Sequence, residues 1–172
     1  GNFIDGKYVG LFEDKTAKLT NAKHAIACVN GTSALQVSLR IVGVQQGDEV
    51  IVPTLTFIAP VNAISYNGAV PLFMDADEYF NIDVEKTIEF INNETIFKNG
   101  WTYNKKTKKK ISAFVAVHVW GNAAWMDELI PICEERNISV VEDASESLGT
   151  VYNSGKYNGK FTGTVGDLGC LS

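Results

Sequence analysis

Short runs of apolar, mostly β-branched residues alternate with stretches of helical pattern along almost the whole chain. The run Glu49–Pro53 is typical of a strand buried on both faces, because parallel strands covered by helices carry continuous apolar residues. Repeated alternation of strand and helix predicts an α/β fold, with a mainly parallel sheet and helices on both of its faces. Further strands are expected at 25–29, 69–75, 111–117, 138–141 and 168–171, and helices at 12–19, 34–41, 58–66, 83–91 and 125–136.

One polar segment interrupts this alternation. Residues 92–110 carry five lysines between Lys105 and Lys110. We interpret the segment as an exposed loop or hairpin before the strand at 111–117. A phosphate-binding role for the lysines is the alternative, although a run of like charges more often marks a solvated surface.

Composition limits the classes of function. The 172 residues suit one domain, and the net charge of -5 argues against a nucleic-acid-binding protein, which usually presents a basic face. No apolar run approaches the roughly 20 residues that span a bilayer, so no membrane partner is expected. Cys28, Cys133 and Cys170 are far apart in apolar contexts, which indicates reduced core thiols and a cytoplasmic location. No zinc-type spacing occurs, so we expect no metal.

Acidic and small polar residues follow the strand expected at 138–141, in the sequence Glu142-Asp143-Ala144-Ser145-Glu146. In open α/β sheets, ligands bind beyond the carboxyl ends of the strands. A carboxylate at that edge, such as Asp143, can serve as a fixed counter-ion for a cationic group. For this stretch alone, a solvated strand end that caps the following residues is the simpler alternative.

The sequence Asn30-Gly31-Thr32-Ser33 joins the strand expected at 25–29 to the helix expected at 34–41. A glycine turn at a helix N-terminus exposes backbone N–H groups, which favour an anion. Thr32 and Ser33 add hydroxyl donors, so Gly31, Thr32 and Ser33 form a candidate phosphate site. Ordinary helix capping explains the segment equally well. The chain contains neither a Walker loop nor a Gly-x-Gly-x-x-Gly dinucleotide fingerprint.

Phe57 and His118 also follow expected strands. Phe57 can stack on a planar ring, although a core phenylalanine is the commoner case. His118 can contact a substrate, or it can hydrogen-bond to the backbone of a structural turn. Combined with Asp143, these residues offer a phosphate site, a stacking ring and a carboxylate at one edge of a sheet. Pyridoxal phosphate (PLP) needs all three, because the protein must hold its phosphate, orient its ring and keep the pyridine nitrogen protonated.

Six segments, in order along nearly the whole chain, resemble PLP-dependent sugar aminotransferases of the DegT/StrS type. They are residues 30–35, 47–53, 56–59, 118–122, 141–144 and 166–172. The resemblance implies that residues 1–172 are part of the PLP-binding large domain of a fold-type I aminotransferase, without the C-terminal small domain. It also implies that Thr32, Ser33 and Ser172 hold the phosphate, that Phe57 stacks on the ring and that Asp143 pairs with the ring nitrogen.

Two features depart from the family pattern. Glu146 stands where the family often has His or Gln near the cofactor hydroxyl. The lysine that forms the Schiff base follows the position of Ser172 by a few residues in the family and is outside this sequence, so we expect this chain alone to be inactive.

The resemblance implies that the parent protein is a homodimer that transfers an amino group, from glutamate, to a keto sugar nucleotide for the amino sugars of surface glycans. The segment 101–110, together with 118–122, resembles the subgroup that acts on UDP-4-keto-6-deoxy-N-acetylhexosamines. A PLP-dependent sugar dehydratase of the same family, with His in place of the lysine, is one alternative. A non-catalytic relative that binds PLP or a nucleotide sugar is another.

Overall fold

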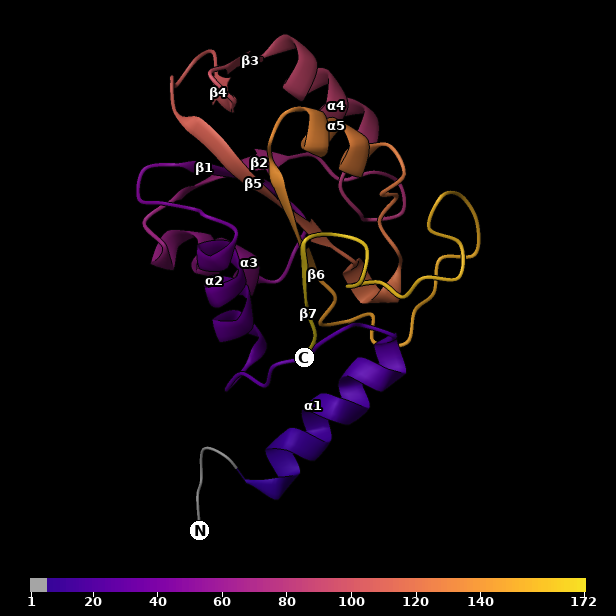
Figure 1. Ribbon diagram of the computed structural model, residues 1–172. Coiled ribbons are helices and arrows are strands. Elements are labelled where there is room, and N and C mark those ends of the chain that lie inside the picture. Colours follow the sequence, from indigo (N-terminus) through magenta and orange to yellow (C-terminus); the bar gives the residue numbers. More distant parts are fainter. Residues whose placement is uncertain (1–5) are drawn as a thin grey trace.

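A computed structural model describes residues 6–172, which fold around a seven-stranded sheet (Figure 1). Five strands are parallel, and they lie in the order β2 (Val70–Met74), β1 (Glu49–Pro53), β5 (Lys110–Val117), β6 (Ser139–Asp143) and β7 (Leu168–Cys170). β5 lies at the centre and is the longest of the five. The parallel sheet confirms the predicted α/β class.

The lysine-rich segment contains a hairpin, as predicted. β3 (Thr95–Lys98) and β4 (Trp101–Asn104) pair antiparallel, and β4 also pairs with the first residues of β5. Asn99 and Gly100 form the connecting turn with φ of 53° and 80°. An Asn-Gly pair suits a two-residue hairpin turn, because both positions need positive φ.

Helices cover both faces of the sheet. One face carries α2 (Gly31–Ile41) and α3 (Ile58–Tyr66), and the other carries α4 (Val84–Asn93) and α5 (Leu129–Glu135). Because successive strand residues point to opposite faces, Val50 and Val52 pack under α2 and α3, while Ile51 between them packs with α4 and α5. Asp83 caps α4, as its position in the sequence indicates, because its side chain accepts a hydrogen bond from the Lys86 N–H.

The predicted strand at 25–29 is wrong. These residues pair with no strand, and the side chains of Ile26 and Val29 are 83% and 87% exposed. The segment instead connects α1 (Lys7–Thr20) to α2, and the Ala27 N–H donates to the Glu13 carboxylate at 2.8 Å. The prediction of a core thiol at Cys28 fails for the same reason, since Cys28 is exposed, whereas Cys133 and Cys170 are buried.

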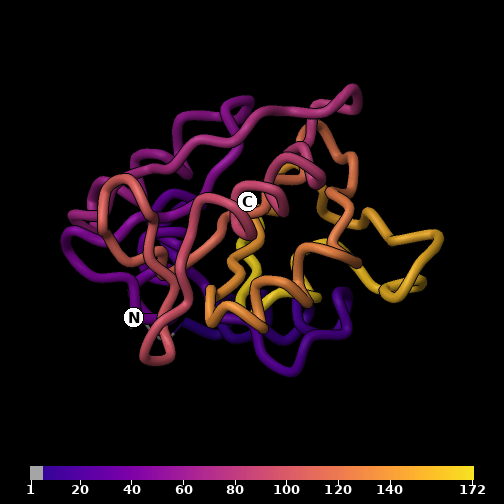
Figure 2. Tube along the Cα trace, turned by 90° about the horizontal axis from the view of Figure 1, so that it is seen from above, coloured from indigo at the N-terminus to yellow at the C-terminus, as the bar shows by residue number. Residues whose placement is uncertain are grey.

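Of the five predicted helices, α3 agrees with its predicted range, and the largest differences are in α1 and α5. α1 begins earlier than expected and lies apart from the sheet at the bottom of Figure 1. α5 begins only at Leu129, because the preceding residues form a turn in which the Asp127 carboxylate accepts a hydrogen bond from the Lys156 N–H at 2.6 Å. Lys156 belongs to the predicted irregular loop at 149–161, which projects from the body of the protein in Figure 2. Over residues 6–172, every helix is too short or too polar to cross a bilayer.

Candidate cofactor site

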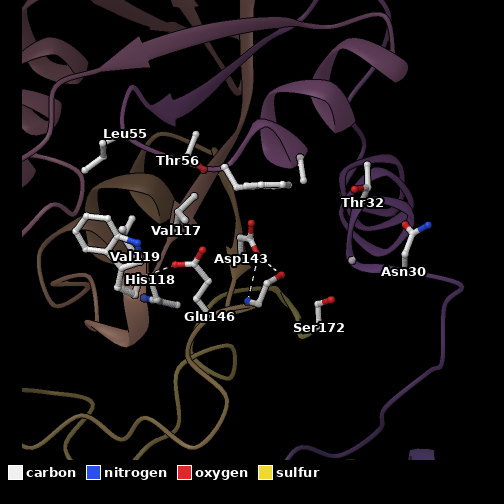
Figure 3. A pocket seen from close by; sticks show the side chains of 15 residues that line it. Asn30, Thr32, Leu55, Thr56, Val117, His118, Val119, Asp143, Glu146 and Ser172 are labelled. Atoms are coloured by element: carbon white, nitrogen blue, oxygen red, sulfur yellow. Dashed lines mark hydrogen bonds between the residues drawn. The ribbon is translucent and has the colours of Figure 1, made fainter.

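A cavity of about 540 Å³ opens beyond the carboxyl ends of β1, β5 and β6, next to the N-terminus of α2 (Figure 3). Seven of the eight site residues expected from the sequence line it: Gly31, Thr32, Phe57, His118, Asp143, Glu146 and Ser172. Ser33 is the exception, and its N–H donates to the side chain of Asn30 within the first turn of α2. The tertiary structure thus brings residues from five separate parts of the chain to one edge of the sheet.

The N-terminus of α2 offers free donors to the cavity. The side-chain oxygen of Asn30 accepts a hydrogen bond from the Ser33 N–H at 2.8 Å, and the backbone carbonyl oxygen of Asn30 accepts one from the Ala34 N–H at 3.1 Å. The N–H groups of Gly31 and Thr32 have no acceptor within residues 6–172. These two groups and the dipole of an eleven-residue helix favour an anion at this end.

Gly31 allows the chain after β7 to approach α2 closely. A Cβ at position 31 would lie 3.1 Å from the Cβ of Ser172 and 3.4 Å from the Oγ of Ser145. Both serine hydroxyls therefore stand beside the free N–H groups of α2. The sequence did not single out Ser145, although a serine two residues after an aspartate is a common partner of that carboxylate in a turn.

Asp143 is the last residue of β6 and is only 6% exposed. Its Oδ1 accepts hydrogen bonds from the Oγ of Ser145 at 2.6 Å and from the Ser145 N–H at 3.2 Å. Its Oδ2 has no donor among the residues that the structure describes. One oxygen thus caps the following turn, as in the alternative considered for the sequence, and the other remains available to a cation in the cavity.

The segment after β1 supplies a buried hydroxyl and an exposed ring. Thr56 has a buried Oγ1 without a hydrogen-bond partner among residues 6–172, although buried polar groups are normally paired. Phe57, the N-cap of α3, has a side chain that is 72% exposed, which excludes the alternative of a core phenylalanine. Both residues line the cavity, so each can contact a bound group without moving from the position it holds in the fold.

His118 is part of the cavity wall, with both ring nitrogens occupied. The side chain is completely buried, and its Nδ1 accepts a hydrogen bond from the Ala124 N–H at 3.0 Å. The proton of the neutral imidazole therefore sits on Nε2, which donates to the Glu142 carboxylate at 2.9 Å. The alternative of a histidine bonded to the backbone of a turn fits this geometry, and the substrate contact of His118 stays a prediction.

Glu142 is a second, fully buried carboxylate on β6, and we predicted no role for it in the site. Burial acts to raise its pKa, but hydrogen bonds from His118 and from the N–H groups of Gly166 and Gly163 outweigh this effect and lower the pKa. The Val165 N–H is a further donor, at 2.8 Å. Glu142 therefore stays ionised and holds the loop that leads to β7 and Ser172.

Glu146 supports the turn that follows β5. Its Oε2 accepts a hydrogen bond from the Trp120 N–H at 2.6 Å. Trp120 lines the same cavity and is 66% exposed; it lies in the family-like segment 118–122, but the sequence did not single it out as a site residue. The predicted contact of Glu146 with a cofactor hydroxyl stays a prediction.

Comparison with known proteins shows the family to which the chain belongs. The sequence model of the DegT/DnrJ/EryC1/StrS aminotransferase family matches residues 1–172. The chain belongs to this family. The GDP-perosamine synthase of Escherichia coli O157:H7 is 38% identical over 167 residues, which are 97% of this chain and 40% of that protein.

Solved structures of the DegT/DnrJ/EryC1/StrS family share the fold. An aminotransferase of this family from Brucella abortus superposes with a TM-score of 0.87 at 31% identity, over 100% of this chain and 43% of that one. The E. coli GDP-4-keto-6-deoxy-D-mannose-3-dehydratase with bound hydrated PLP superposes with a TM-score of 0.75 at 27% identity, over 94% of this chain and 38% of that one. The chain thus spans about two fifths of the length of these relatives.

Proposed function

We propose that the protein containing this chain uses PLP to transfer an amino group, from glutamate, to the ketone of a sugar nucleotide. Residues 1–172 then form part of its PLP-binding large domain. The observation that carries the proposal is the cavity at the strand ends, where free N–H groups, a buried carboxylate with an unpaired oxygen and an exposed aromatic ring meet. This set of groups matches the anionic phosphate, the cationic ring nitrogen and the flat ring of PLP.

Each group has a role that follows from its chemistry. The N–H groups of Gly31 and Thr32, with the hydroxyls of Thr32, Ser33 and Ser172, hold the phosphate. Phe57 packs against the ring face. Asp143 holds a proton on the ring nitrogen, because an adjacent carboxylate favours the charged form of a base. When bound, PLP supplies an electron sink for the carbon that exchanges its amino group.

Two remaining assignments concern the rim of the cavity. Glu146 stands beside the cofactor hydroxyl, and His118 belongs to the wall that faces the substrate. The preference for UDP-4-keto-6-deoxy-N-acetylhexosamines rests on the resemblance of the segments 101–110 and 118–122.

Charge and exposed surface support a homodimer with shared sites. Within the described part of the chain, the cavity lining contains Asp143 and Glu146 but neither lysine nor arginine. A cofactor phosphate and a substrate diphosphate would add further negative charge, so cations must come from outside this lining, and we infer that a second copy supplies them. Ile26 and Val29, just before Asn30, expose the apolar surface that a second copy would cover. The free thiols suit the cytoplasm.

A sugar dehydratase is the second candidate, because the superposed E. coli dehydratase shares the fold. A single assay separates the two activities. Incubation of the full-length protein with glutamate and a keto sugar nucleotide yields 2-oxoglutarate and an amino sugar from an aminotransferase. A dehydratase also converts glutamate to 2-oxoglutarate, because removal of a sugar hydroxyl is a reduction that glutamate must supply, but it releases ammonia and yields a deoxy keto sugar with no new amino group.

Substitution of Asp143 tests the proposal most directly. Asp143→Asn in the full-length protein should lower turnover by about 100-fold or more, because the ring nitrogen loses its charged partner. Binding of the PLP phosphate should change by only a few-fold, since the groups of α2 are untouched. Asp14→Asn, on the exposed surface of α1, is the matched control. Near-normal turnover of Asp143→Asn would contradict the assignment.

A further inference from the structure

Trp120 combines backbone strain with exposure at the cavity rim. Its φ is 52°, in the left-handed region that bulky residues rarely adopt. Phe80 has a φ of 69°, and the two rings meet edge to face with centroids 5.0 Å apart. A strained residue of this kind costs about 1–3 kcal/mol and is common at functional sites. Burial of the indole adds little stabilisation that would offset this cost, because 66% of the residue stays exposed.

Two loops hold Trp120 in this conformation. The Trp120 N–H donates to Glu146 Oε2 at 2.6 Å, and the next carbonyl oxygen, that of Gly121, accepts a hydrogen bond from Thr150 Oγ1 at 3.0 Å. On its other side, the Val119 N–H donates to the side chain of Asn81, next to Phe80, at 3.2 Å. The position of the indole is therefore set by contacts from separate parts of the chain and not by its own burial.

Trp120 shares the cavity with Asp143, so a group that lies on the indole is next to the cofactor of the proposed function. In the transfer proposed above, the carbon that reacts is the keto carbon of the hexose, so the hexose must enter this cavity. The C–H face of a hexose is apolar and its hydroxyls are polar. A flat aromatic face with neighbouring polar groups therefore suits it.

We propose that the exposed face of Trp120 is the platform on which the hexose of the sugar nucleotide packs, and that Glu146 is the positioning residue that holds Trp120 in place. The inference deepens the proposed function and rests on it. The nucleoside diphosphate then extends away from the indole, toward surface that this chain leaves open. Trp120 is thus a determinant of sugar binding rather than of nucleotide binding.

Binding of stable probes to the full-length, PLP-loaded protein tests this role. UDP-N-acetylglucosamine and GDP-mannose carry a hexose without a ketone, and UDP and GDP are their counterparts without the hexose. We expect the wild-type protein to bind one sugar nucleotide more tightly than its diphosphate in calorimetric titrations. Trp120→Ala should raise the Kd for that sugar nucleotide by about 10-fold, equivalent to about 1.4 kcal/mol, and leave the Kd of the diphosphate unchanged.

Conservative variants separate positioning from general damage. Glu146→Ala should reproduce part of the loss, and Glu146→Gln should restore binding, because its amide oxygen can accept the Trp120 N–H. Trp101→Phe, in the distant β3–β4 hairpin, should change neither Kd.

The outcomes also distinguish the inference from the proposed function. If PLP binds and Trp120→Ala keeps the full preference for the sugar nucleotide, the platform is refuted while the proposed function stands. The platform is equally refuted if the wild-type protein binds neither sugar nucleotide more tightly than its diphosphate. Failure of the wild-type protein to bind PLP, measured by cofactor absorbance after gel filtration, would instead refute the proposed function.

Discussion

The buried charge of Glu142 gives the sharpest test of the architecture behind the site. Four donors converge on its two oxygens at 2.7 to 2.9 Å: His118 Nε2 and the N–H groups of Gly163, Val165 and Gly166. Glu142→Gln preserves the shape of the side chain but replaces one oxygen with an NH2 group. At least one buried donor would then face another donor, and the negative charge that all four donors share would be lost.

The expected cost of Glu142→Gln is about 3–5 kcal/mol, the range for breaking a buried charged pair by changing one partner. This is a large part of the about 5–15 kcal/mol that stabilises a typical domain. Urea denaturation of both full-length proteins at pH 7.5, followed by fluorescence, measures the free energy of unfolding. Glu135→Gln is the matched control, because the side chain of Glu135 is 69% exposed, and its ion pair with Arg136 is expected to contribute less than about 1 kcal/mol.

The pH dependence of stability gives an independent check on Glu142. Its pKa is lowered in the folded protein, so its stabilisation is fully present above the unfolded pKa of about 4.3 and disappears as the pH falls through the folded value. The difference in Tm between wild-type protein and Glu142→Gln should therefore shrink below about pH 4. A loss smaller than about 1 kcal/mol at pH 7.5, or a Tm difference that does not change with pH, would refute the reasoning.

Two further predictions concern the backbone and the thiols. A Cβ at Gly169 in β7 would overlap the carbonyl oxygen of Gly163, so Gly169→Ala should lower the free energy of unfolding by about 2 kcal/mol or more in urea titrations. Gly10 lies within α1 with open space around it, so Gly10→Ala should instead raise the free energy of unfolding by about 0.5–1 kcal/mol. Among the three thiols, only the exposed Cys28 should react quickly with a disulfide reagent in the native protein. Burial raises the pKa of the Cys133 thiol to about 12 and that of the Cys170 thiol to about 11, so neither forms a reactive thiolate readily. An unchanged free energy of unfolding in Gly169→Ala would contradict the backbone prediction. Rapid reaction of all three thiols before unfolding would contradict the thiol prediction.

Local pattern predicted most of the elements, because the periodicity of buried side chains differs between strands and helices. The helix at 58–66 and the strand at 49–53 agree with the structure residue for residue. The failure at 25–29 has a different origin. A short apolar run has the propensity of a strand, but strand formation needs a neighbour with free backbone groups, and the neighbour is set by the tertiary fold.

The sequence alone determined the α/β class and the edge of the sheet at which ligands bind, since parallel strands end together and the polar residues follow them. The family resemblance pointed to Asp143, but only the tertiary structure shows why this acid, and not Glu142, serves the cavity. Val140 packs with α5 and Val141 packs with α2. Because successive side chains of β6 point to opposite faces, Glu142 points to the face covered by α5 and Asp143 to the face covered by α2. The sequence likewise did not predict Trp120 as a site residue, because its left-handed φ and its contact with Glu146 depend on loops that are far apart in the sequence.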